Sequence, residues 1–336
     1  MTPALRVFRS LQEAEASFGP CALTIGNFDG VHLGHLVLLH RVRDLARELH
    51  VKAAVLTFDP HPAKVVAPEK APKLLTSCEQ RCTLFAQAGI DEVLILPFDR
   101  TFSELSPTAF VEQVLVRTLR TKAVVVGENF RFGYKHQGDT ALLAQLGREH
   151  DFLVEALSSV TERGRVVSST EIRQAVKSGK IVRAGRMLGR PFSLDGEVVK
   201  GHGIGSTQTV PTLNLQARSE VMPATGVYVT RTFDLDGPRI WRSITNVGYR
   251  PTFDGDSLTV ETFLLDSLTG DPPQSIRVEF LHYVRPERKF ESAEALKQQI
   301  LRDVGRAKTY FRRRQAAREV IPLTTSEISD PEILQT

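Results

Sequence analysis

Short apolar runs alternate with longer amphipathic stretches between Cys21 and about Leu157. The runs have the length and composition of buried strands, and the stretches between them, such as residues 35–50 and 104–119, have the 3.6-residue period of helices. Strands are predicted at residues 22–26, 52–58, 92–98, 122–127 and 152–157. Alternating strands and helices build a parallel sheet covered by helices, so this half is predicted to be a Rossmann-like α/β domain.

The pattern changes near Gly185. From Arg186 to about Tyr283, shorter β-like runs are separated by Gly, Pro and Asp turns, which predicts a small antiparallel β-barrel. A helical period returns over residues 290–314, with Ser292 as its cap. The predicted domains are therefore 1–185 and 186–316, followed by a polar tail, 317–336, that we expect to be flexible.

Composition narrows the class of protein. The chain has 336 residues, of which 41% are hydrophobic, enough for about two domains. No apolar run is long enough to span a membrane, and no signal sequence precedes the first strand, so we expect a cytoplasmic protein with no membrane partner. Three cysteines are too few for a disulfide framework and are expected to be reduced structural thiols.

The net charge of +4 would suit an anionic ligand. The basic residues are dispersed, however, and the dense run Arg312–Arg314 is predicted to end a helix, where cations meet the negative end of the helix dipole. Nucleic acid is therefore not predicted as a partner. The oligomeric state cannot be predicted.

The first candidate site is a strand-to-helix turn. The strand at 22–26 is followed by the residues NFDGVHLGH and then by a helical period, which places His32 and His35 at a helix start. Unpaired backbone N–H groups and the helix dipole favour phosphate binding there. The two imidazoles would add hydrogen-bond donors that follow the charge as it builds on the transferring phosphate group and the leaving pyrophosphate. Gly34 leaves room for the ligand by lacking a Cβ.

The string GNFDGVHLGH (26–35) resembles the ATP-binding signature of the bacterial riboflavin kinase/FAD synthetase family, within the nucleotidylyltransferase superfamily. The resemblance continues through TFDPHP (57–62), Glu79-Gln80-Arg81, GENFRFG (127–133) and SSTEIR (168–173), and extends to about residue 314. It implies adenylylation of FMN to FAD with ATP, by in-line attack of the FMN phosphate on the α-phosphorus with Mg²⁺ across the phosphates.

The resemblance also assigns ligand contacts. Arg173 would act on the leaving pyrophosphate, although Ser168 and Glu171 also have the spacing of a helix capping box. Phe58 would either stack on flavin or fill the core. The remaining ATP and FMN contacts implied are Gly26, Asn27, Phe28, Asn129, Phe130, Arg131, Ser168, Ser169 and Thr170. The family usually has Asp where this chain has Asn129, while Phe132 is expected to be structural.

The second candidate site follows a glycine-rich turn. Thr212 and Asn214 lie two apart in a predicted strand, so their oxygen atoms face the same side and suit Mg²⁺ bound to nucleotide phosphates. PTLN (211–214) resembles the PTAN motif of the riboflavin kinase family, whose Thr and Asn hold the metal and the ATP phosphates. The turn would approach ATP through Gly201, Gly203 and Gly205.

Glu261 is a lone carboxylate in an apolar strand, on the same face as Thr259 and Phe263, and periodicity does not decide whether that face is solvated. The resemblance makes Glu261 the base that accepts the proton of the riboflavin 5′-hydroxyl, and places Asn246 and Arg250 near the flavin. This half implies phosphorylation of riboflavin to FMN with ATP.

Two alternatives remain open on the sequence. The chain could adenylylate another phosphate monoester and use the barrel only for binding. Alternatively, the kinase half could be a degenerate flavin-binding domain, because Ser206, Thr209 and Val210 replace the family's usual Arg, Gly and Phe, and Phe263 replaces a common His.

Overall fold

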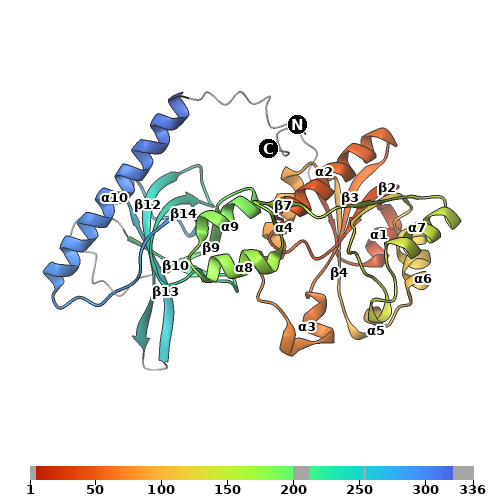
Figure 1. Cartoon of the computed structure of the whole chain (residues 1–336), viewed down its shortest axis with the longest axis horizontal. Coiled ribbons are helices and arrows are strands. Elements are labelled where there is room, and N and C mark those ends of the chain that lie inside the picture. Colours follow the sequence, from red (N-terminus) through yellow and green to blue (C-terminus); the bar gives the residue numbers. More distant parts are fainter. Residues whose placement is uncertain (1–4, 200–211, 253–254, 321–336) are drawn as a thin grey trace. The chain divides into compact units, whose positions relative to one another are not determined.

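The computed structural model describes residues 5–199, 212–252 and 255–320, which form two compact units (Figure 1). Unit 1 contains the residues up to Lys177 together with Arg183–Arg190 and Ser219–Met222, and unit 2 contains the other described residues. The expected boundary after residue 185 lies inside helix α9 (Ile181–Leu188).

Unit 1 is built on a six-stranded parallel sheet. Its strands are β1 (Arg6–Phe8), β2 (Cys21–Ile25), β3 (Lys52–Phe58), β4 (Glu92–Leu96), β5 (Thr121–Gly127) and β6 (Leu153–Leu157), in the order β1-β4-β3-β2-β5-β6. The strand order reverses around β2, which lies between β3 and β5. Ligands of open α/β sheets bind at the carboxyl ends of the strands at such a point, so the predicted nucleotide turn after β2 is in the expected place.

Helices and a short hairpin complete unit 1. The elements are α1 (Leu11–Ser17), α2 (Leu33–Glu48), α3 (Pro62–Val66), η1 (Pro68–Lys70), α4 (Cys78–Gln87), α5 (Arg100–Ser103), α6 (Pro107–Phe110), η2 (Val111–Thr118), η3 (Tyr134–His136), α7 (Thr140–Glu149), β7 (Thr161–Glu162), β8 (Arg165–Val166), α8 (Ser169–Lys177) and α9. Alternate strand residues supply two core layers: Leu23 and Leu56 pack on one face of the sheet, and Ala22 and Val55 on the other.

Two details of unit 1 differ from the sequence prediction. The edge strand β1 was not expected, because three residues carry too little periodicity to be recognised. The helix predicted over 104–119 begins only at Pro107, capped by Ser106, and continues as the π-helix η2. Within η2, the Thr118 hydroxyl also donates to the carbonyl of Gln113, five residues earlier, at 2.9 Å.

Unit 2 is a closed antiparallel barrel with one long helix, as predicted. Its strands are β9 (Phe192–Val199), β10 (Thr212–Ala217), β11 (Gly226–Asp234), β12 (Ile240–Thr252), β13 (Gly255–Leu264) and β14 (Ser275–Arg285), in the order β10-β13-β12-β11-β14-β9. Helix α10 (Ala293–Val320) packs on its outer surface, where Ala307 meets Val227, Val229 and Ile244.

The barrel interior contains a chain of buried hydroxyl groups. The Thr230 hydroxyl lies 2.8 Å from those of Ser243 and Thr245, and Thr245 lies 3.0 Å from Thr262. All four residues are fully buried. Because each hydroxyl both donates and accepts, the chain satisfies polar groups that would otherwise be costly inside a barrel.

Helix α10 corrects two expectations. It continues to Val320, so Arg312–Arg314 do not end it, and the predicted helix-terminus role for these arginines is wrong. The residues that follow them, Gln-Ala-Ala-Arg-Glu, are good helix formers, which explains the longer helix. The predicted tail therefore begins inside this helix, and residues 321–336 lie outside the described residues. Among the helices described, none is both long and apolar enough to cross a bilayer.

Candidate active sites

Aromatic packing in the core holds the loop between β2 and α2 in place. Phe28 is buried and meets the rings of His35 and Phe85 edge-on, at centroid distances of 5.0 Å and 5.5 Å. A Cβ added to Gly26 would lie 3.3 Å from the Phe28 ring. Phe28 thus anchors the loop from within the core, and Gly26 and Asn27 are half-buried beside it.

The two predicted histidines form a reciprocal cap at the start of α2. Their rings stack with centroids 3.6 Å apart, and the Nδ1 atom of each accepts from the backbone N–H of the other at 3.4 Å. Burial, together with the charge of Arg190, lowers the pKa of His32 to about 4. Burial and the neighbouring His32 and Arg190 also lower the pKa of His35 well below its usual value.

This geometry fixes the chemical form of the pair. Near neutral pH both rings are uncharged, and in each ring Nδ1 is the acceptor of a hydrogen bond, so the proton resides on Nε2. Each histidine can therefore offer one N–H to a phosphate oxygen. The pair supplies hydrogen-bond donors without adding positive charge.

Gly34 makes room for a side chain of the protein itself, while its expected contact with a ligand stays a prediction. A Cβ at this position would lie 3.2 Å and 3.3 Å from ring atoms of His32. Its absence lets the His32 ring lie over the first turn of α2. The constraint on Gly34 in this structure therefore comes from the protein's own histidine.

Asp29, which the sequence analysis did not select as a site residue, connects the histidine loop to residues 75–76 and to Arg173. Its buried carboxylate accepts from the backbone N–H groups of Leu75 and Thr76, at 2.9 Å and 3.1 Å, and pairs with Nη2 of Arg173 at 2.6 Å. Arg173 also donates from Nε to the Lys73 carbonyl at 2.7 Å. The predicted pyrophosphate-binding arginine is thus held in place by Asp29.

The start of α8 only partly follows the capping-box pattern. The Ser168 hydroxyl accepts from the N–H of Glu171 at 3.3 Å, but the Glu171 carboxylate pairs with Arg183 and not with the Ser168 backbone. The Ser169 hydroxyl donates to the Asp29 carbonyl at 2.9 Å, and Thr170 is exposed. Ser169 therefore links α8 to the histidine loop.

Two further arginines support the same loop by binding its carbonyl oxygens. Arg190 donates to the carbonyls of Gly30 and Val31 at 2.6 Å and 2.8 Å. Arg81 donates from Nη1 to the carbonyl of Asn27 at 2.8 Å and to the Thr57 hydroxyl at 2.9 Å. Arg81 belongs to a motif noted in the sequence, whereas Arg190, far along the chain, carries no local signal.

The remaining predicted residues of unit 1 follow the neighbouring strands. Phe58 ends β3 and packs against Phe98, with ring centroids 5.5 Å apart. After β5, Phe130 stacks on the buried Phe132 at 5.6 Å, while Asn129 and Arg131 are exposed, with Arg131 paired to a carboxylate at 3.7 Å. Since β2 lies between β3 and β5, all three loops leave the same edge of the sheet.

In unit 2, the predicted kinase residues form a row across three strands. Glu261 on β13 lies directly opposite Asn214 on β10 and directly opposite Asn246 on β12. Opposite residues in antiparallel strands project from the same face with Cβ atoms about 5 Å apart. Thr212 lies two residues before Asn214 on that face, because Leu213 is buried inside the barrel. The sequence did not decide which face of its strand carries Glu261. In the structure this side chain lies on the outer face of the barrel.

Glu261 lines a cavity of about 230 Å³ between the barrel and α10. Asn246 and Phe263 share its barrel wall. The opposite wall contains Arg285, Arg288 and Phe290, which the sequence analysis missed because they lie at the end of β14 and in the irregular segment between β14 and α10. Nε of Arg285 donates to Asp303 at 2.8 Å, and the Arg288 guanidinium lies 4.7 Å from the centre of the Phe290 ring. A carboxylate beside an aromatic and apolar wall suits a planar substrate with a reactive hydroxyl.

Thr212 and Asn214 line a second cavity, of about 580 Å³, with Val199 and the segment Pro272–Ser275. Among the described residues, no cluster of three or more His, Cys, Asp or Glu could hold a metal ion by itself. A hydroxyl and an amide oxygen beside Glu261 fit Mg²⁺, which normally keeps water ligands and is bound mainly through substrate phosphates. Gly201, Gly203 and Gly205, and the side chain of Arg250, lie outside the described residues.

Two family models match the chain in succession. The FAD synthetase model matches residues 14–171 and the riboflavin kinase model matches residues 188–311. A bifunctional riboflavin kinase/FMN adenylyltransferase from Haemophilus influenzae is 37% identical over 91% of this chain and 99% of its own length. A protein of the same description from Escherichia coli K12 is 38% identical over 87% of this chain and 93% of its own length.

A solved structure agrees with the fold of the whole chain. It is described as a macrolide-efflux protein from Streptococcus pneumoniae, and it superimposes with a TM-score of 0.80 at 26% identity, covering 91% of this chain and 99% of the other. The two family models and the length of the matches favour the two-activity interpretation over both alternatives left open by the sequence. The chain belongs to the family of bifunctional riboflavin kinase/FMN adenylyltransferases.

Proposed function

We propose that the two reactions of this family take place at two separate sites of the chain, adenylylation of FMN in unit 1 and phosphorylation of riboflavin in unit 2. The observation that carries this division is the distribution of the predicted residues. His32, His35 and Arg173 belong to unit 1, whereas Thr212, Asn214 and Glu261 belong to unit 2. The family models divide in the same way, on either side of the boundary near Gly185 that we propose for the two domains.

At the first site, an FMN phosphate oxygen attacks the α-phosphorus of ATP, and the bond to pyrophosphate breaks. The Nε2–H groups of the two histidines are proposed to donate to the phosphate oxygens on which negative charge increases, and Arg173 to bind the leaving pyrophosphate. The Asp29 carboxylate keeps the Arg173 guanidinium oriented toward the loop. Gly26, Asn27, Phe58, Asn129, Phe130 and Arg131 are proposed to surround the nucleotide and the flavin.

At the second site, Glu261 is proposed to accept the proton of the riboflavin 5′-hydroxyl as that oxygen attacks the γ-phosphorus of ATP, releasing ADP. Asn246 and Phe263 line the same cavity and would orient the flavin. Mg²⁺ would neutralise the phosphate charge, held by the side-chain oxygens of Thr212 and Asn214. Because Asn214 lies opposite Glu261, base and metal ligand approach the same phosphoryl group.

Small molecules are the substrates: ATP, riboflavin and FMN, with FAD as the final product. We propose that the protein works in the cytoplasm, where ATP is made, and we propose no nucleic-acid or membrane partner.

Two variants test the division between sites. Glu261→Gln keeps the shape of the side chain but removes the base, and should lower FMN formation by about 10²- to 10⁴-fold while FAD formation from supplied FMN is unchanged. His32→Ala should do the reverse, by about 10²-fold or more. His32→Asn loses the imidazole Nε2–H but keeps a side-chain oxygen that can cap α2. It therefore shows whether the activity depends on the imidazole or only on the cap.

Chromatography of FMN and FAD, after parallel incubations with ATP and Mg²⁺ plus either riboflavin or FMN, measures the two reactions separately. Glu279→Gln, on a distant part of the barrel, and His50→Asn, beyond the end of α2, are matched controls that should retain both activities. Loss of both activities in either folded site variant would refute the division.

A further inference from the structure

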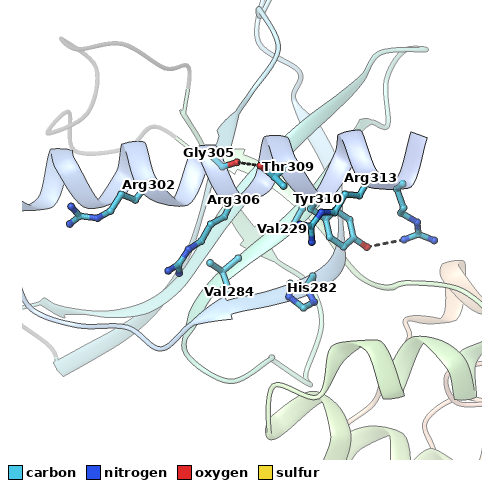
Figure 2. Close-up of a pocket in the computed structure, with 10 residues that line it drawn as sticks. Val229, His282, Val284, Arg302, Gly305, Arg306, Thr309, Tyr310 and Arg313 are labelled. Atoms are coloured by element: carbon cyan, nitrogen blue, oxygen red, sulfur yellow. Dashed lines mark hydrogen bonds between the residues drawn. The ribbon is translucent and has the colours of Figure 1, made fainter. Parts of the chain in front are cut away.

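A third concave surface of unit 2 is lined by other residues than the Glu261 cavity and the Thr212 cavity. It is a cavity of about 760 Å³ between α10 and the outer face of β11 and β14 (Figure 2). Its walls carry Arg302, Arg306, Arg313, Arg314, Tyr310 and His282, which we call the arginine pocket. The five helix residues recur at the spacing of one helix face, and none of them lines the Glu261 cavity.

Within the part of the chain that the structure describes, no carboxylate neutralises the arginine pocket. The described residues that line it include no Asp or Glu. Among the described residues, Arg306 and Arg313 form no hydrogen bond or ion pair, while Arg302 donates only to the neutral amide of Gln299 and Arg314 to the Tyr310 hydroxyl. Like charges on one helix face repel each other, and an anion bound between these arginines would relieve that repulsion.

The pocket also has an aromatic and apolar side. The rings of Tyr310 and His282 stack at a centroid distance of 5.7 Å and an angle of 18°. Val229 and Val284 form the apolar floor beneath them, and Figure 2 shows Arg306 and Tyr310 reaching from α10 toward these strands. A Cβ added to Gly305, which also lines the pocket, would meet no other atom within 4 Å, so there is open space at this position.

We propose that the arginine pocket binds a phosphate ester of an aromatic compound, such as a nucleotide, at a site separate from both active sites. Guanidinium groups form paired, charge-assisted hydrogen bonds with phosphate, and the Tyr310–His282 pair and the valine floor suit a planar ring. The cavity has the volume of small-molecule pockets, about 300–1,000 Å³. Its concave shape and apolar floor distinguish it from the flat basic stripe that a duplex nucleic acid needs.

His282 provides a local reporter, because it lines this pocket and lines neither the Glu261 cavity nor the Thr212 cavity of the same unit. The NMR signal of its ring proton, assigned with His282→Gln, is followed in the whole chain during titration with ATP, FMN or inorganic pyrophosphate. We expect saturable shifts with ATP or FMN, and binding of pyrophosphate at least about 10-fold weaker because it lacks the ring.

Matched double variants separate a built site from general charge. Arg306→Ala/Arg313→Ala should weaken binding by about 100-fold, since each lost charged hydrogen bond corresponds to about 10-fold or more. Lys308→Ala/Arg312→Ala removes the same charge from the same helix outside the pocket and should change affinity less than about 3-fold. If the first double variant melts early, Arg306→Gln alone serves the same comparison.

Three results would overturn the proposal: no His282 shift with either aromatic phosphate, equal weakening in both double variants, or pyrophosphate binding as tightly as ATP and FMN. Binding of a short DNA duplex that weakens equally in both double variants would likewise show an attraction to the charge of α10 alone. None of these results depends on turnover at either active site, so they leave the proposed function untouched.

Discussion

Acidification should destabilise unit 1 through the stacked histidines at the start of α2. His32 is almost fully buried and is near Arg190 and Arg173, and burial and both positive charges disfavour a proton on its ring. The unfolded chain has no such environment and binds the proton with an ordinary histidine pKa. The perturbation is therefore a change of pH from 7.5 to 5, with His32→Asn as the variant that removes the titration but can still cap the helix.

Proton linkage determines the direction and the size of this loss of folding stability. The pKa of His32 falls from 6.5 to about 4 on folding, so the unfolded state binds more protons between these values and stability is lost as pH falls below 6.5. Between pH 7.5 and pH 5, the protonation of His32 in the unfolded state alone should cost about 2 kcal/mol. His35, whose pKa is also lowered, contributes in the same direction.

Amide hydrogen exchange of β2 and β5 peptides measures the stability of unit 1 without assuming that both units unfold together. Between pH 7.5 and pH 5, the unfolding free energy of unit 1 should fall by about 2 kcal/mol more in the wild type than in His32→Asn. His50 is exposed and has a positive φ, a backbone conformation that Asn also adopts readily. His50→Asn should therefore show the same pH dependence of stability as the wild type. Equal pH dependence in His32→Asn and wild type, or an NMR titration that places the His32 pKa near 6.5, would refute the argument.

Three further predictions concern single contacts. Asp29→Asn leaves the Arg173 guanidinium without its buried partner and should destabilise unit 1 by about 3 kcal/mol, measured by the same exchange experiment, whereas loss below about 1 kcal/mol would mean that the pair is well solvated. Thr230→Val breaks the buried hydroxyl chain and should lower the barrel's unfolding free energy by about 1–3 kcal/mol in urea, with Thr259→Val, partly exposed, as the control. Chelation of Mg²⁺ should abolish both activities, and readdition should restore them. FMN formation that survives chelation would contradict the role proposed for Thr212 and Asn214.

The sequence predicted the parallel sheet and the barrel because both rest on local patterns. Strand β3 is found at the predicted residues, and β2 differs by one residue at each end. The loop of the first site was predicted for the same reason, because a buried strand, a turn and two histidines at helical spacing all lie between residues 22 and 35. Local periodicity thus reveals a site when its residues are close in sequence.

Contacts that join distant segments could not be predicted in this way. The partner of Arg173 is Asp29, more than a hundred residues earlier, and Arg190 reaches back to Gly30 over a similar separation. The outward face of Glu261 also depended on closure of the barrel, since the strand alternates equally well either way round. These facts are decided by tertiary packing, which a single sequence pattern does not contain.

The neutral histidines and the uncompensated arginines show two opposite uses of cationic side chains in one protein. At the first site, burial and Arg190 remove the charge of His32, so the ring can hydrogen-bond to phosphate without binding the pyrophosphate product too tightly. In the arginine pocket, the guanidinium groups are permanently charged, and no carboxylate is among the described residues that line the surface. Turnover requires weak product binding, whereas a site that only holds a ligand has no such limit. The difference in charge state is therefore what we expect if the first surface performs chemistry and the arginine pocket retains a ligand.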